Sequence, residues 1–428
     1  MMEKGKSFRK FMILWAGEFV SAIGSGLTSF GLGVYAYQQT KSAAAVALIS
    51  LFAFLPSILL SPFAGVLADR IDRRLLMIIG DGCSALGLLY IFICMLFGQA
   101  TIVQICIGVT ISSIFAALLE PAYKATITEL LTEEQYSKAG GLVQVAGSSK
   151  YLFSPILAGM LLRVADIKVL LIIDMATFFL TVIATCVVRN GMENKKRIVK
   201  AGMWDDFKEG WAAITKKKGV AVIVLLMTFV TFFLGFIQTL LTPLVLSFTD
   251  SATLGTMETV CACGMLVSSV LMGFLSIKKH YVKLMAIGLA TTGLFMAMTG
   301  IRANLMIMGI GGFLFFASLP IVNITADCLI RMSIEEEVQG RAWGLIGIIS
   351  QLGYVFAYGL SGFLADHVFE PMLASDGILA DSVGRLIGTG TGRGIGFSLI
   401  IGGVLIIVTA AIFYHNKEVR RLEEHYVS

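Results

Sequence analysis

The sequence predicts an all-α polytopic membrane protein with twelve transmembrane helices in two pseudo-symmetric halves of six. Three observations lead to this fold class: the composition, the number of apolar segments and an internal repeat. Of the 428 residues, 57% are hydrophobic and 14% are charged, and the mean hydropathy is +0.86. Soluble globular chains carry about 25% charged residues. The apolar surplus therefore indicates a chain that lies largely in a bilayer.

The apolar segments have the length that a membrane requires. A hydrocarbon core of about 30 Å is crossed by about 20 helical residues. The basic N-terminal tail leads directly into the first segment, which is longer than the apolar core of a cleavable signal, so we expect an uncleaved first span. The predicted spans are 10–36, 43–67, 75–97, 101–128, 138–162, 168–188, 220–247, 254–277, 282–301, 304–330, 340–364 and 394–414.

The positions of Lys and Arg predict the orientation. With the N-terminus inside, most of the 33 basic residues fall in cytoplasmic loops and tails, and few fall outside. The positive-inside rule therefore predicts that both termini are cytoplasmic.

One long polar segment divides the chain into an N-terminal six-helix bundle (1–188), a linker (189–219) and a C-terminal bundle with a tail (220–428). Within the linker, Trp204, Phe207, Trp211 and Ile214 recur at helical spacing. They predict an amphipathic helix on the inner membrane surface.

An internal repeat supports the two halves. Shifted by 203 residues, 133–164 aligns with 336–367, and the matched pairs include Gly159 with Gly362. A second alignment, shifted by 208, pairs Gly65 and Gly80 with Gly273 and Gly288. Two related six-span halves are the architecture of alternating-access carriers.

Several other functions are disfavoured. The seven Cys lie in or beside apolar segments without zinc spacing, and the four His lie in loops or tails. The stretch "GTGTGRG" (388–394) lacks the Gly-Lys-Ser/Thr ending of a phosphate loop. We therefore expect no enzyme activity, no cofactor and no metal, and an ion gradient remains as the energy source for uphill transport.

The segment "GVLADRIDRR", residues 65–74, lies between spans 2 and 3. It resembles the loop signature of the major facilitator superfamily, Gly-x-Leu-Ala-Asp-Arg-x-Gly-Arg-Arg/Lys, and departs only at Asp72. Gly65 would allow close helix contact, and Asp81 would brace the arginines. The resemblance implies a gating motif made of Gly65, Asp69, Arg70, Arg73, Arg74 and Asp81.

A finer resemblance is to the macrolide-efflux and siderophore-exporter branch of drug:proton antiporters. It rests on "EEQYSKAGGL" at span 5, "FKEGWAAI" in the linker and the segment before span 12. Two features depart: Ser154-Pro155-Ile-Leu-Ala158-Gly159 replaces Gly-Pro-x-x-Gly-Gly, and Ser112 lies where many antiporters have Arg. The resemblance implies a rocker-switch carrier in which Asp69 closes the cytoplasmic side near 340–341.

Six polar residues inside apolar segments are candidates for contact with substrate or protons: Glu18, Glu120, Lys150, Gln238, Asn323 and Asp327. Lys150 is too deep to reach the membrane surface. Its repeat counterpart is Gly353, so it is either a specialised site residue or the buried partner of Glu18 or Glu120.

Two further acidic residues, Asp174 and Glu258, are expected near the outer face, where water reaches them.

The leading functional hypothesis is a secondary transporter that exports amphipathic or hydrophobic, macrolide-type molecules by proton antiport. The alternative is an exporter or flippase of an anionic amphiphile such as a siderophore or lipid, with Lys150 binding the anionic group. We expect the partners to be a small-molecule substrate, protons and the lipid bilayer, with no nucleic acid. The expected state is a monomer in a bacterial plasma membrane.

Overall fold

The computed structural model describes residues 7–189, 203–274 and 279–427, with the backbone only at 69, 133, 203–206, 336 and 425–427. Within this part of the chain the secondary structure is helical, and no strand occurs. Among the described residues, twelve spans are long and apolar enough to cross a membrane, which confirms the predicted number.

The described residues of each predicted span lie on one of these. Two of the spans consist of two α-helices in series. The spanning helices are α1 (Phe8–Thr40), α2 (Ala43–Arg70), α3 (Arg73–Leu96), α4 (Ile102–Ala116) with α5 (Leu119–Leu130), α6 (Glu133–Leu152) with α7 (Ser154–Val164), α8 (Ile167–Arg189), α10 (Lys218–Leu246), α11 (Ser251–Phe274), α12 (Tyr281–Ile301), α13 (Leu305–Ser333), α14 (Glu336–Leu364) and α17 (Arg393–His415).

The remaining helices are short or lie outside the spans. They are α9 (Met203–Lys216) in the linker, η1 (Ala365–Phe369), α15 (Glu370–Met372) and α16 (Gly384–Ile387) before α17, and α18 (Lys417–Val427) after it. The eleventh span continues from α14 through η1 and α15 to Met372.

The chain forms two compact units. The first contains 1–41, 48–200 and 250–258, and the second contains 42–47, 201–249 and 259–428. The start of α2 thus belongs to the second unit, and the start of α11 belongs to the first. The sequence did not predict these two short segments.

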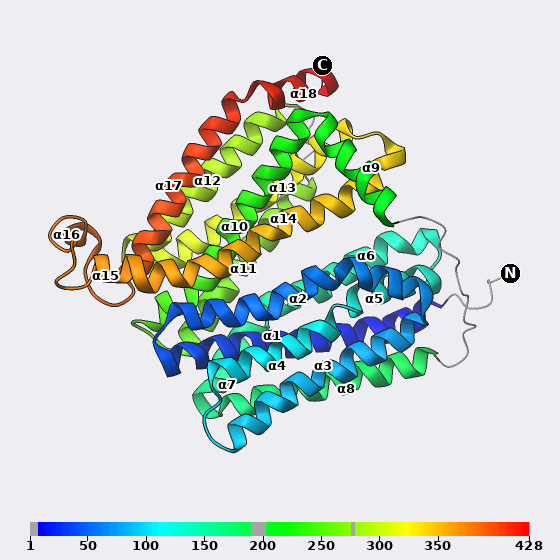
Figure 1. Ribbon diagram of the computed structural model, residues 1–428, viewed down its shortest axis with the longest axis horizontal. Coiled ribbons are helices and arrows are strands. Elements are labelled where there is room, and N and C mark those ends of the chain that lie inside the picture. The colour runs from blue at the N-terminus through cyan, green and yellow to red at the C-terminus, as the bar shows by residue number, and fades with distance from the viewer. Residues whose placement is uncertain (1–6, 190–202, 275–278, 428) are drawn as a thin grey trace. The chain divides into compact units, whose positions relative to one another are not determined.

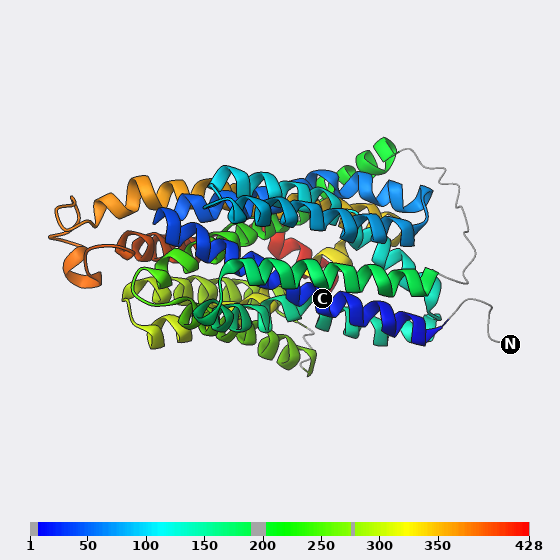
Figure 2. The ribbon, with the colours of Figure 1, turned by 90° about the horizontal axis from the view of Figure 1, so that it is seen from below.

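In the first unit, α1 packs closely against α8 (Figure 1, Figure 2). The contact uses glycines seven residues apart on α1, namely Gly17, Gly24 and Gly31. A Cβ at Gly24 would overlap Thr177 of α8, and a Cβ at Gly31 would lie 2.8 Å from the Leu170 side chain. Small residues at such an interface let helix backbones approach closely, which is the main source of association between helices in lipid.

The repeat also appears as matching contacts at the two exchanged segments. A Cβ at Gly159 would lie 2.5 Å from the carbonyl oxygen of Ser251, and one at Gly362 would lie 2.8 Å from that of Ala43. Gly159 and Gly362, which are 203 residues apart in the sequence, therefore make the same kind of close contact with the start of another helix, each within its own unit.

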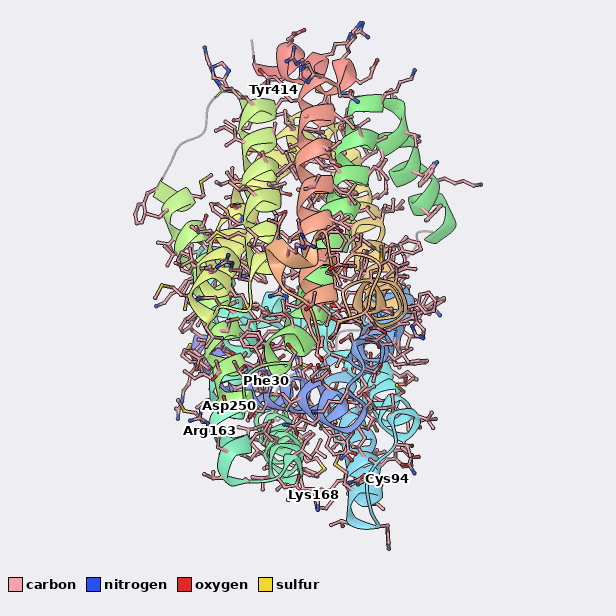
Figure 3. All side chains as sticks on the ribbon, turned by 90° about the vertical axis from the view of Figure 1, so that its left-hand side faces the viewer. Phe30, Cys94, Arg163, Lys168, Asp250 and Tyr414 are labelled. Carbon is pink, nitrogen blue, oxygen red and sulfur yellow. The ribbon has the colours of Figure 1, made fainter. Side chains whose placement is uncertain are left out.

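Polar contacts hold the tips of these segments. Arg163 pairs with Asp250 at 2.7 Å in the first unit (Figure 3), and Asp366 accepts a hydrogen bond from the Ser42 hydroxyl at 2.5 Å in the second. Hydrogen bonds from the Thr253 hydroxyl and N–H, and then from Arg163, lower the pKa of Asp250 to about 2. Asp250 therefore remains ionised over the physiological pH range.

In the second unit, α9 lies against the start of α14. Glu209 pairs with Arg341, and Gly210 lies close to the Arg341 backbone. The linker contains the helix α9 at the residues where the sequence predicts an amphipathic helix. Ile214 is buried, whereas Phe207 and Trp211 are 45% and 50% exposed and stack on each other. The contact of α9 with the membrane surface stays a prediction. The side chain of Trp204 lies outside the described residues.

We predict that Gly300→Ala lowers the melting temperature of the solubilised protein. Its Cβ would overlap the Gly396 carbonyl oxygen, where α12 packs on α17, and overpacking costs about 1–3 kcal/mol. Gly309→Ala is the control, since no described atom lies within 4 Å of a Cβ there. Equal melting curves for the two variants would contradict this account of the packing.

Candidate transport and coupling site

Two of the spans that carry predicted site residues contain a proline near their middle. Pro121 lies just after the junction of α4, which ends at Ala116, and α5, which begins at Leu119; Pro155 lies at the start of α7, directly after α6. The backbone at 117, 118 and 153 stays in the α-helical region, so each span continues through its junction. Proline has no N–H for the helical ladder, so each one leaves a carbonyl of the preceding turn without its usual donor.

Charged residues lie beside both prolines. Glu120 directly precedes Pro121 on α5, and Lys150 lies in the last turn of α6. Because Pro155 has no N–H, the Tyr151 carbonyl lacks its helical donor, and a carbonyl oxygen without a donor favours a nearby cation. The local backbone thus explains part of why a lysine is tolerated in the middle of span 5.

The electrostatic partner of Lys150 is Asp174 on α8. In the described part of the chain Lys150 makes no ion pair within 4.0 Å, and its ammonium lies 5.9 Å from the centre of the Tyr151 ring. Of the two alternatives for Lys150, the buried pair with Glu18 or Glu120 is not found among the described residues. The reason is that the α1–α8 contact brings Asp174 toward the end of α6, where Ser154 donates to the Ile23 carbonyl at 2.9 Å.

Glu120 forms an ion pair with Lys124 and not with Lys150. Its carboxylate lies 2.6 Å from the Lys124 ammonium, one turn further along α5, and the two side chains are 75% and 65% exposed. An exposed pair at this spacing contributes about 0.3–0.5 kcal/mol. Glu120 remains available to a ligand because little of it is buried.

Glu18 is partly buried on α1 and interacts electrostatically with Glu120, Asp81 and the Tyr123 phenol. The structure therefore places Glu18 among acidic and phenolic groups of the first unit.

The structure differs from the expectations for two acidic residues, Asp174 and Asp81. Asp174 is only 1% exposed, because α1 covers it at Gly24, so it does not face water. Asp81 is also 1% exposed and does not brace the arginines of the motif. Neither of its carboxylate oxygens has a hydrogen-bond partner among the described residues.

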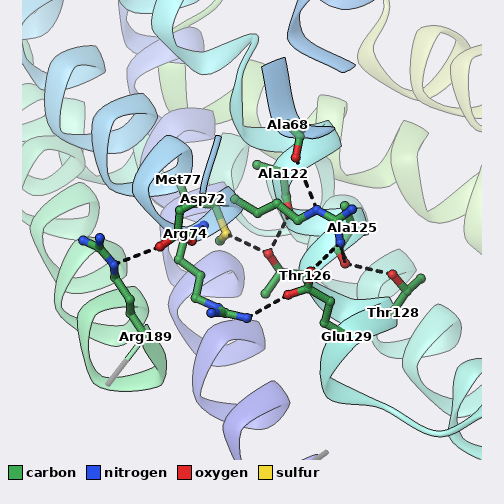
Figure 4. Close-up of polar contacts among 11 residues, drawn as sticks. Ala68, Asp72, Arg74, Met77, Ala122, Ala125, Thr126, Thr128, Glu129 and Arg189 are labelled. Carbon is green, nitrogen blue, oxygen red and sulfur yellow. Dashed lines mark hydrogen bonds and ion pairs between the residues drawn. The ribbon is translucent and has the colours of Figure 1, made fainter. Parts of the chain in front are cut away.

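Glu129 at the end of α5 is the carboxylate that holds the motif arginines. Its two oxygens accept from Arg73 and Arg74, each at 2.7 Å (Figure 4). Arg73 also donates to the carbonyls of Ala68 at 3.3 Å and Ala125 at 3.0 Å. Arg74 is 3% exposed. The motif is therefore fixed to span 4, a contact that the sequence did not predict.

Asp72, which replaces the glycine of the loop signature, has a structural role. One Asp72 oxygen accepts from the Arg74 N–H at 3.1 Å and caps α3, and the other lies 3.1 Å from Arg189 of α8. A glycine here could make neither contact. No described atom lies within 4 Å of a Cβ at Gly65, so the close helix contact expected there is not found.

The other predicted gating residues are Arg70, which is exposed, and Asp69, whose side chain lies outside the described part of the chain. The gating role of the motif therefore stays a prediction.

The remaining candidates lie in the second unit. Gln238 is partly buried on α10, Asn323 is exposed on α13, and Asp327 lies 4.0 Å from Arg331, one turn further along the same helix. The six predicted residues thus divide equally between the two units.

We predict that Glu129→Ala destabilises the protein by about 2–3 kcal/mol, because a buried arginine loses its carboxylate. The measurement is thermal unfolding in detergent. Glu120→Ala is the matched control, since its ion pair is exposed and should contribute less than about 1 kcal/mol. A larger loss in the control would show that Glu129 does not anchor the motif.

Comparisons with known proteins agree with this architecture. The profile of the Major Facilitator Superfamily matches residues 14–249. The chain is 25% identical over 434 residues to macrolide efflux protein A of Streptococcus pyogenes, covering 99% of this chain and 100% of that protein. It is also 25% identical to the MFS-type transporter YfiS of Bacillus subtilis, over 83% of this chain and 87% of that protein.

Among solved structures, a bacterial homologue of the human lysosomal transporter Spinster has the same fold. The TM-score is 0.73 at 15% identity, with 98% of each chain covered. The profile match, the twelve spans and the shared fold lead to one conclusion: this chain is a multi-pass membrane protein that belongs to the Major Facilitator Superfamily of transporters.

Proposed function

We propose that the protein exports amphipathic or hydrophobic, macrolide-type molecules in exchange for protons, by alternating access. The observation that carries the proposal is the position of Glu18, a partly buried carboxylate in a spanning helix beside further carboxyl groups. Ionisable residues at such positions mark ion and proton pathways. The full-length similarity to macrolide efflux protein A supports the substrate class.

The prolines in spans 4 and 5 fit this function. Proline within a span is tolerated where neighbouring helices, side chains or water satisfy the freed backbone groups. Glu120 and Lys150 beside these prolines offer charges of opposite sign, and Tyr151 next to Lys150 is 57% exposed and adds an aromatic surface. Together they would bind a molecule that has both apolar and charged parts.

The proposed setting is the plasma membrane of a bacterium, with both termini cytoplasmic and the protein acting as a monomer. The distribution of Lys and Arg supports this orientation.

The test uses proteoliposomes with an imposed pH gradient and a panel of macrolides, lipophilic cations and anionic amphiphiles. The wild-type protein is expected to transport macrolides or lipophilic cations against their gradient, with protons moving in the opposite direction. Glu18→Gln is expected to bind the same compound but to lose gradient-driven transport. Undiminished gradient-driven transport in Glu18→Gln would overturn the coupling role.

A second prediction concerns Lys150 and the alternative substrate class. If the protein moves an anionic amphiphile, Lys150→Met should weaken the apparent affinity for anions roughly tenfold, the equivalent of about 1.4 kcal/mol. For a neutral or cationic substrate we expect no such loss. Lys168→Met is the control, because Lys168 is a cation of the same unit that pairs with Asp166 and not with a candidate site residue. Selective loss of anion transport would replace the macrolide proposal with the anionic one.

A further inference from the structure

Three carboxyl groups from three helices come together inside the first unit, although the sequence places them far apart. They are Glu18 on α1, Asp81 on α3 and Asp174 on α8. Both α1 and α3 pack against α8, and Asp81 interacts electrostatically with both Glu18 and Asp174. We call this group the carboxyl cluster.

Asp81 is the most isolated member of the carboxyl cluster. It is 1% exposed, and neither oxygen meets a hydrogen-bond donor in the described residues. An ionised carboxylate without water, donor or cation is costly by several kcal/mol, so a group in this position is normally neutral. This environment therefore favours the neutral form of Asp81 over the ionised one.

A second polar group lies beside the cluster without a partner. Tyr123 on α5 is 5% exposed, its hydroxyl has no hydrogen-bond partner among the described residues, and it interacts electrostatically with Glu18. A phenol can both donate and accept a hydrogen bond, so it can follow a change in the charge of the neighbouring carboxyl group.

Asp174 differs from Asp81 because it has donors and a cation. The Ser25 hydroxyl donates to it at 3.3 Å, and Lys150 interacts with it electrostatically. With Lys150 and Asp174 both charged, the carboxyl cluster and Lys150 together are neutral only when Glu18 and Asp81 hold protons. Besides its three members, the titratable groups that face the carboxyl cluster from the packed helices are Glu120, Tyr123 and Lys150.

The ligand of the cluster is a proton and not a metal ion. No group of three His, Cys, Asp or Glu side chains in the described ranges could hold a metal ion. The three carboxyl groups are near enough to influence one another's charge but are not arranged to bind one cation together. Of the three, only Glu18 is partly exposed, so protons would enter and leave there.

We propose that the carboxyl cluster, with Tyr123 and Lys150, is the proton-binding site that couples transport, and that Glu18 exchanges its proton with water while Asp81 stores one inside the unit. Each step moves one proton between a carboxyl oxygen and water or a second carboxyl, and no other bond changes. The proposal rests on the proposed function, because it names the site that binds the proton exchanged for the exported molecule.

The first experiment detects the proton directly and does not require transport. Infrared difference spectra of the full-length protein in lipid are recorded between acid and alkaline pH. We expect the carbonyl band of a protonated carboxyl group to disappear on alkalinisation, and part of this change to be missing in Asp81→Asn. Asp166→Asn, an exposed acid paired with Lys168, is the control and should keep the full change.

Asn has nearly the volume of Asp and is neutral like the protonated acid, so Asp81→Asn should melt at or above the wild-type temperature. A full wild-type infrared change in both Asp81→Asn and Asp174→Asn would overturn the proposal. So would a protonated-carboxyl band that does not respond to pH, because a proton that never leaves cannot couple transport.

The second experiment separates coupling from substrate binding. In proteoliposomes, Asp81→Asn should lose gradient-driven accumulation but keep substrate exchange without a pH gradient. Equal gradient-driven transport in Asp81→Asn and wild type would overturn the coupling role of the cluster. If wild-type protein transports no compound with the pH gradient, the proposed antiport fails, whereas the infrared titration still decides whether the cluster binds a proton.

Discussion

The close contact between α1 and α8 is the constraint on which the first unit depends. Three glycines seven residues apart let side chains of α8 pack directly against the backbone of α1. This contact buries Asp174, places the Ser25 hydroxyl on it and brings Lys150 within its electrostatic range. A larger residue at Gly24 would separate the helices at the point where these charges meet. In this unit the packing of the helices therefore determines which charged groups interact.

Charge inside a span is compensated by nearby groups. In span 5, Pro155 leaves the Tyr151 carbonyl without its helical donor, next to Lys150. Asp174 adds an electrostatic interaction with the same lysine. In span 4, Glu120 is compensated by its ion pair with Lys124.

The fold could be predicted almost completely from the sequence, because a span must be apolar over a fixed length and the loop motif falls between two such spans. The repeat was equally informative, since Gly159 and Gly362 make matching contacts. These features depend on local composition and on spacing. Neither requires knowledge of which helices are neighbours.

The candidate site was predicted less well, because hydropathy gives the depth of a residue in the membrane but not what lies beside it. Asp174 was expected to meet water because it lies near a span end, yet α1 covers it. Glu129 was missed because it lies at the end of an apolar span and no spacing rule connects it to Arg73 and Arg74. Asp81 was assigned to those arginines because it lies close to them in the sequence. On α3, however, its carboxylate makes no hydrogen bond to them.

The two exchanged segments have a consequence for dissecting the protein. Expression of 1–200 and 201–428 as separate polypeptides is the obvious way to isolate the halves. Each fragment would then lack a piece that its compact unit includes, 250–258 in one and 42–47 in the other. Gly159 and Arg163 would lose the start of α11, and Gly362 and Asp366 would lose the start of α2. Co-expression, or a fragment pair that restores these peptides, is therefore the sounder design for fragment complementation.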